Sequence, residues 1–106
     1  MAKFLIEASY TVEGIRGLQS GGGSSRRDAV AKALEGAGAS LESFYFAFGS
    51  SDVYAVADVP DNATAAAVAL TVNASGAVQN KMTVLLTPEE VDAAAQKSIS
   101  YTPPGG

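Results

Sequence analysis

The sequence predicts a single α+β domain: an antiparallel sheet with helices on one face, in the order β-α-β-β-α-β, followed by one more helix. Segments with apolar residues at every second position alternate along the chain with segments whose apolar residues recur at helical spacing. The chain has 106 residues, enough for one hydrophobic core and too few for two domains. We place the domain at residues 1–98 and an extended tail at 99–106.

Four segments have the two-residue alternation that is typical of strands. They are residues 3–12, 41–48, 52–59 and 77–86. The short Gly-Ser-Ser segment at 49–51 predicts a turn, so the second and third strands should form a hairpin. Within the second strand, Phe44, Phe46 and Phe48 should share one face.

Between the first two strands, residues 13–18 predict a short turn or helical piece, and the Gly/Ser-rich residues 21–25 predict a loop. The pair Ser25 and Asp28 resembles a capping box that would open the first long helix. Glycines at 36 and 38 should end that helix.

A second helix is predicted at 63–75, capped by Asp61 or Asn62 and closed by Gly76. After the fourth strand, Thr87, Pro88 and Glu90 have the spacing of an N-cap, a first helical position and a capping-box acid, which predicts a third helix at 88–97. The whole order is that of a ferredoxin-like, split-βαβ arrangement.

The composition excludes several kinds of chemistry. The chain has neither cysteine nor histidine, so thiolate, disulfide, imidazole and zinc-thiolate sites are excluded. We expect no metal and no cofactor. The net charge of -4 disfavours nucleic acid, and no apolar run approaches the roughly 20 residues of a membrane helix. The N-terminus does not have the pattern of a signal peptide, so we expect a cytoplasmic protein without membrane partners.

Several blocks, in order along nearly the whole chain, resemble the GYD-domain family: 9–11, 13–18, 26–27, 44–49, 58–61, 72–76 and 86–90. That family is largely uncharacterised, and its fold is similar to the dimeric α/β-barrel group, in which two sheets pack face to face. The resemblance therefore implies a homodimer. The name-giving Gly-Tyr-Asp turn here reads Gly49-Ser50-Ser51-Asp52, so Ser51 stands where the tyrosine is expected.

The face of the sheet away from the helices should be rich in apolar side chains, and such a face usually finds a partner. We interpret it as a homodimer interface; the alternative is a barrel interior that holds a small apolar or aromatic ligand. By strand parity this face should carry Leu5, Leu41, Tyr45, Ala47, Tyr54, Val56 and Leu85.

The helix at 63–75 is apolar almost all round, which predicts that it is buried all round. We therefore expect a second interface that includes Ala66 and Ala69, and with it an assembly larger than a dimer. The alternative is that alanine is present simply as the best helix former.

Ser25, Arg26 and Arg27 precede or open a helix, where free N–H groups and two guanidinium groups could bind an anion. The segment lacks the Gly-Lys-Ser/Thr ending of a phosphate-binding loop. The interpretation we favour is a flexible loop with solvated arginines, and the anion site is the alternative.

Four residues are candidates for catalysis: Arg16, Tyr45 and Tyr54 could bind and polarise a carbonyl group, with Asp52 as the base. We favour the interpretation that the tyrosines pack an interface and that Asp52 orders its turn. The leading hypothesis is thus a self-associating small-molecule-binding or assembly module. The alternative is a cofactor-independent enzyme that acts on a small carbonyl or aromatic compound.

Overall fold

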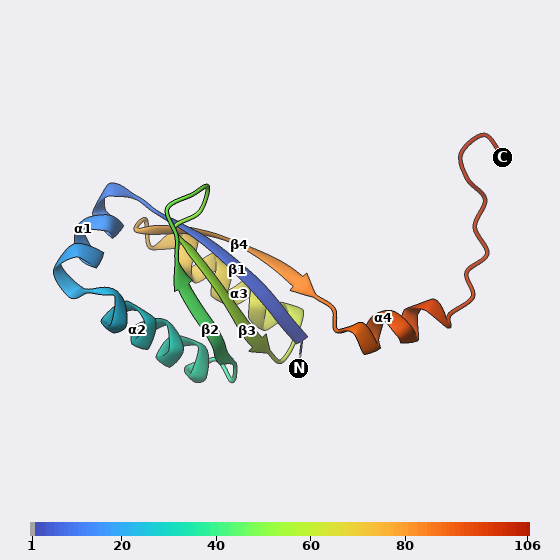
Figure 1. Ribbon diagram of the computed structural model, residues 1–106, viewed down its shortest axis with the longest axis horizontal. Helices are drawn as coiled ribbons and strands as arrows, with labels where there is room; N and C mark the ends of the chain where they lie inside the picture. The colour runs from blue at the N-terminus through green and yellow to red at the C-terminus, as the bar shows by residue number, and fades with distance from the viewer. Residues whose placement is uncertain (1) are drawn as a thin grey trace.

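The computed structural model describes residues 2–106, and it confirms the predicted α+β class and the predicted order of strands. The elements are β1 (Ala2–Tyr10), α1 (Val12–Gly21), α2 (Gly23–Gly36), β2 (Ser40–Phe46), β3 (Val53–Val59), α3 (Asn62–Ala74), β4 (Val78–Leu85) and α4 (Pro88–Ala95). The strands form one antiparallel sheet in the order β2-β3-β1-β4 (Figure 1).

The hydrophobic core lies between one face of the sheet and the two helices α2 and α3. Along β3 every second side chain is buried, from Val53 to Val59, because this central strand has helices over one face only. Leu34 of α2 and Ala65 of α3 meet Phe4 and Val59 in a single cluster. Helix α2 packs mainly on β2 and α3 mainly on β4, so a groove of about 640 Å³ separates the two helices.

A β-bulge corrects the predicted orientation of Leu41. Leu41 pairs with Ala57, whereas Ser43 already pairs with Val56, so one extra residue, Glu42, interrupts the register. The predicted position of Leu41 on the open face is therefore wrong: its side chain packs against the core under the helices. Phe48 also leaves the expected face, because β2 ends at Phe46 and Phe48 is fully exposed in the following loop.

The predicted loop at 21–25 is also wrong, because helices α1 and α2 are separated only by Gly22, whose φ is 86°. Gly23 starts α2 where a Cβ atom would lie 2.9 Å from the ring of Phe46, so glycine permits this close approach. The predicted capping box at Ser25 does not form; Gly22 is the N-cap, without a side-chain hydrogen bond.

The remaining helix ends follow the predictions. Asp61 caps α3 by accepting a hydrogen bond from the backbone N–H of Thr64 over 2.7 Å. That hydrogen bond lowers the pKa of the Asp61 carboxyl below its ordinary value. Thr87 and Glu90 form the complete capping box of α4, with Pro88 at its first position.

Residues 86–106, which we call the C-terminal arm, project beyond the end of β4 (Figure 1). Every residue from 88 to 106 is exposed. The longest dimension of the molecule is 57 Å and its radius of gyration is 17.0 Å. A compact chain of this length would have a radius of gyration of about 13 Å. Among the helices of residues 2–106, none combines the length and the apolar character needed to cross a bilayer.

Candidate functional site

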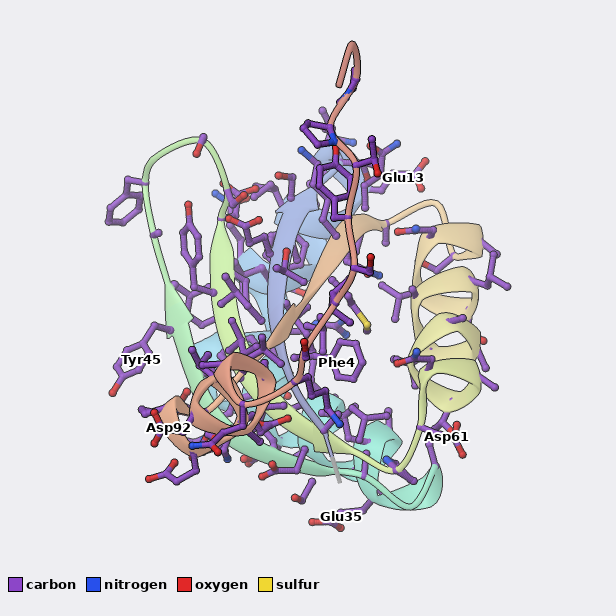
Figure 2. The ribbon with its side chains drawn as sticks, turned by 90° about the vertical axis from the view of Figure 1, so that its right-hand side faces the viewer. Phe4, Glu13, Glu35, Tyr45, Asp61 and Asp92 are labelled. Atoms are coloured by element: carbon purple, nitrogen blue, oxygen red, sulfur yellow. The ribbon has the colours of Figure 1, made fainter. Side chains whose placement is uncertain are left out.

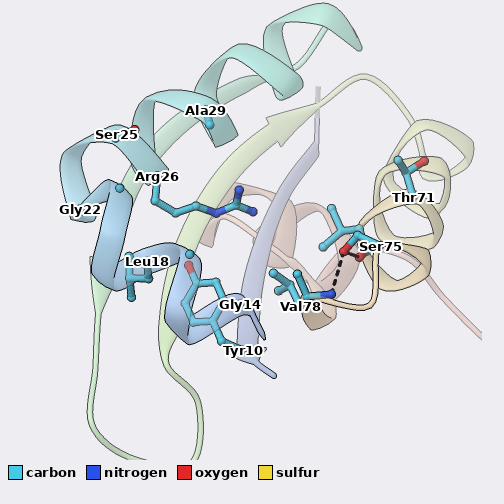
Figure 3. Close-up of a pocket in the computed structure, with 14 residues that line it drawn as sticks. Tyr10, Gly14, Leu18, Gly22, Ser25, Arg26, Ala29, Thr71, Ser75 and Val78 are labelled. Carbon is cyan, nitrogen blue, oxygen red and sulfur yellow. Dashed lines mark hydrogen bonds between the residues drawn. The ribbon is translucent and has the colours of Figure 1, made fainter. Parts of the chain in front are cut away.

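A cleft of about 520 Å³, which we call the cleft, lies between α1 and α2 on one side and the C-terminal end of α3 on the other (Figure 3). Four glycines of the α1–α2 segment line one wall, which keeps that wall free of large side chains. The opposite wall comes from Thr71 and Val72 of α3 and from Ser75, the C-cap residue of that helix. Below the cleft, a cavity of about 140 Å³ extends between the helices and the sheet, and Tyr10, Arg26, Ala29, Val72 and Val78 line both spaces.

The inner cavity is apolar except for three side chains, Tyr10, Arg26 and Asn80. Its other walls are aliphatic and aromatic side chains of the core. Ligand sites commonly combine such apolar walls with a few converging polar groups.

Arg26 reaches from α2 into the cleft, with its guanidinium group directed toward the strands (Figure 3). Its Nε atom is buried and has no hydrogen-bond partner. Within residues 2–106, no carboxylate lies within ion-pairing distance of it. A buried polar atom without a partner is costly, since water has been removed and nothing replaces it. An anionic group that entered the cleft would supply the missing hydrogen-bond partner of this guanidinium group.

Asn80 of β4 contributes a second unpaired polar atom to the same cavity. Its Oδ1 is buried without a partner, while its Nδ2 donates to the carbonyl of Ala69 over 3.5 Å. Sequence reasoning missed this residue. The signal was present, because Asn80 is the one polar residue among Val78, Met82 and Val84 on the helix-facing side of β4.

Tyr10 lies on the helix-facing side of β1, two residues after the buried Ala8, and Asp52 holds its backbone in place. The Tyr10 N–H donates to Asp52 Oδ2 over 2.9 Å, and the Asp52 N–H donates to the carbonyl of Ala8 over 2.8 Å. Asp52 thereby ties the loop after β2 to the end of β1. This geometry agrees with the predicted role of Asp52 in ordering the turn.

Of the three residues proposed to bind an anion, two line the cleft and one does not. Ser25 and Arg26 both line the cleft. Arg27 does not: it is exposed and pairs with Asp28 over 3.2 Å. Only one of the two arginines therefore faces the cleft.

The candidate catalytic tyrosines lie on the open face, away from the cleft. Tyr45 and Tyr54 are directly paired across β2 and β3, and Tyr45 is 69% exposed, pointing away from the sheet (Figure 2). Arg16 is exposed on α1, and it lines neither the cleft nor the inner cavity. The carboxylate of Asp52 already accepts a hydrogen bond from the backbone N–H of Tyr10.

The predicted interface residues occupy two surfaces. Leu5 and Val56 lie on the open face and are half-buried in the single chain. At the end of this face Lys3 pairs with both Asp58 and Glu42 at 3.1 Å, and these hydrogen bonds raise the pKa of Lys3. On α3, Ala66 is exposed and Ala69 is half-buried. The prediction that α3 is buried on all sides is not met within one chain, since Leu70 is 71% exposed.

The GYD domain family matches residues 4–95, which is most of the chain and includes α4. The chain belongs to this family of α+β domains. The match shows the resemblance seen in the sequence to be correct. No curated protein and no solved structure matches the chain.

Proposed function

We propose that this GYD-domain protein is a self-associating module that binds a small organic carboxylate at Arg26, in the cleft between the α1–α2 segment and α3. The observation that carries the proposal is the Arg26 guanidinium group, which lies above an apolar cavity with its Nε buried and unpaired. A protein gains nothing in stability from such an arrangement, so a bound anion is the natural partner.

The chemistry of the cavity defines the ligand class. A guanidinium group binds a carboxylate through two parallel hydrogen bonds. The apolar walls favour a hydrocarbon body, and the unpaired Oδ1 of Asn80 favours a hydrogen-bond donor such as a hydroxyl group on that body. A hydroxylated aromatic or branched aliphatic acid satisfies all three conditions.

The dimensions agree with a ligand of one ring. The inner cavity measures about 140 Å³. An apolar cavity of roughly 150 Å³ is large enough to hold benzene. The ring would occupy this cavity and leave its carboxylate at Arg26, beneath the wider outer cleft.

Self-association is the second part of the proposal, and the open face of the sheet supports it. Leu5, Val56 and the tyrosine pair present apolar surface on the side that no helix covers. A ferredoxin-like sheet of this kind would pack against its copy as a dimeric α/β barrel. Ligand and partner would then use opposite faces of the sheet.

The binding test compares Arg26→Gln with Arg27→Gln, a matched control that removes a neighbouring charge outside the cleft. Isothermal titration would use benzoate and 4-hydroxybenzoate as probes and benzamide as the uncharged analogue. We expect Arg26→Gln to weaken carboxylate binding by about ten- to hundredfold, because one charge-assisted interaction is lost. Arg27→Gln should bind like the wild type.

Native mass spectrometry of protein purified from its own source adds an unbiased readout. A retained mass that disappears in Arg26→Gln would identify the ligand. Equal affinity of all three proteins for benzoate, or equal affinity for benzoate and benzamide, would contradict the carboxylate site.

A further inference from the structure

The C-terminal arm has no support from its own domain. Helix α4 has only eight residues. Isolated helices shorter than about 12–15 residues are marginal in water. Even with its complete capping box, α4 is exposed along its whole length. A helix of this kind is expected to pack on another surface.

Large apolar side chains recur along the arm without cover. Leu86, Val91, Ile99 and Tyr101 are exposed by 62%, 51%, 79% and 72%. On α4 the helical spacing places Val91 on one side together with Ala94 and Ala95, while Ala93 lies on the opposite side. Helix α4 therefore has one side that carries Val91, its only large apolar side chain, flanked by small alanines.

The surface area of the chain exceeds that of a compact monomer. The accessible surface is 7168 Å². A compact protein of 10.7 kDa would expose about 5,500 Å². The excess of about 1,700 Å² is roughly twice what each partner buries in a stable complex of standard size. Docking the arm on a second copy would remove an excess of this size.

The geometry points to an arm that, within the proposed dimer and resting on that self-association, crosses to the second copy of the chain and packs its Val91 side against Tyr45 at the β2 edge of that copy's open face, beside the contact between the two sheets. The arm leaves the domain directly after Leu85, which pairs with Lys3 across β1 and β4 and has its side chain on the open face. It then projects away from its own sheet (Figure 1). The open face is left bare by the helices, and Tyr45 is its most exposed large residue. The family match extends through α4, so this helix belongs to the unit that the family shares.

The test is sedimentation of the full chain with single substitutions at exposed positions, each checked for native circular dichroism. The wild type should be a dimer. Val91→Lys and Tyr45→Ser should each weaken dimerisation by at least about tenfold, which corresponds to ~1.4 kcal/mol. Ala93→Lys, the same change on the opposite side of α4, should leave the dimer intact. Hydrogen exchange should show α4 amides that are protected in the dimer and unprotected in Val91→Lys.

Three results would overturn the inference: a wild type that is monomeric through the micromolar range, equal effects of Val91→Lys and Ala93→Lys, or a dimer unaffected by Tyr45→Ser. The proposed carboxylate site is tested separately, because Val91 lies outside the cleft. Benzoate binding by Val91→Lys should therefore match the wild type. A dimer that tolerates Val91→Lys would refute the arm contact alone, whereas a monomeric wild type would also refute the proposed self-association.

Discussion

The carboxylate of Asp52 accepts a hydrogen bond from the backbone N–H of Tyr10 over 2.9 Å, although 42 residues separate the two in sequence. Tyr10 lines both the cleft and the inner cavity. Asp52 thus holds the backbone of a residue whose side chain lines the proposed ligand site.

Asp52→Ala should reduce the free energy of unfolding by about 1–2 kcal/mol, because the Tyr10 N–H loses its acceptor. Asp52→Asn should cost less, since the amide oxygen can still accept the bond. Urea denaturation measures both. If Asp52 positions Tyr10 for binding, Asp52→Ala should also weaken benzoate binding more than Asp52→Asn does. An Asp52→Ala protein as stable as the wild type would contradict the assigned role of Asp52.

Two glycines of α1 should respond oppositely to alanine. A Cβ atom at Gly14 would overlap the carbonyl oxygen of Ala77, so the helix or the β4 entry would have to move. At Gly17 nothing lies nearby. Gly17→Ala should therefore raise stability by about 0.5–1 kcal/mol through helix propensity.

Gly14→Ala should instead lower the melting temperature, and it should also disturb the cleft, which Gly14 lines. Thermal unfolding of the two variants measures the contrast. If both alanines stabilised the protein, the close contact between α1 and the chain at Ala77 would be disproved.

The sequence predicts the strands well because their alternation is long and regular, but it hides the features that depend on tertiary contact. The bulge at Glu42 reverses Leu41, and nothing in the local pattern marks the extra residue. The Gly/Ser stretch is helical despite the poor helix propensity of glycine, and Gly23 lies so close to the Phe46 ring that a Cβ atom there would be 2.9 Å from it, a tertiary contact that the local sequence does not reveal.

The cleft was only partly predictable, for a similar reason. The polar groups of the inner cavity beneath it, Tyr10, Arg26 and Asn80, come from β1, α2 and β4, so no motif contains them. Arg26 and Arg27 are indistinguishable in sequence. Helix phase alone turns the first into the cleft and leaves the second paired with Asp28.

The cap of α3 should make stability depend on acid pH. The folded-state pKa of Asp61 is lowered below 3.8 by its hydrogen bond from Thr64, so the carboxylate stabilises the folded state fully above the unfolded-state pKa. That contribution is lost as the pH falls through the lower, folded-state pKa.

Asp61→Ala should therefore lower the melting temperature at neutral pH, and the difference from the wild type should shrink in strong acid. Asp61→Asn supplies the control, because asparagine caps helices nearly as well and does not titrate. A difference between Asp61→Ala and the wild type that stays constant from neutral pH down to pH values below 3.8 would show that the carboxylate is not the cap.

A substitution at Asn80 tests whether the unpaired polar atom in the cavity lowers the stability of the ligand-free protein. Its Oδ1 is buried without a partner, and its Nδ2 bond to Ala69 is long, at 3.5 Å. Leucine has a similar shape and leaves no polar atom unpaired, so Asn80→Leu should raise the free energy of unfolding of the ligand-free protein by about 1 kcal/mol.

The same substitution removes the acceptor for a ligand hydroxyl group. The Asn80→Leu protein should therefore no longer bind 4-hydroxybenzoate more tightly than benzoate. Its affinity for benzoate should be unchanged, because that affinity depends on Arg26. Urea denaturation and titration calorimetry on one preparation measure both effects. If Asn80→Leu lowered the free energy of unfolding and still bound 4-hydroxybenzoate more tightly than benzoate, Asn80 would have a structural role. Higher stability together with loss of the preference for the hydroxylated acid is expected only if the Oδ1 of Asn80 faces the ligand.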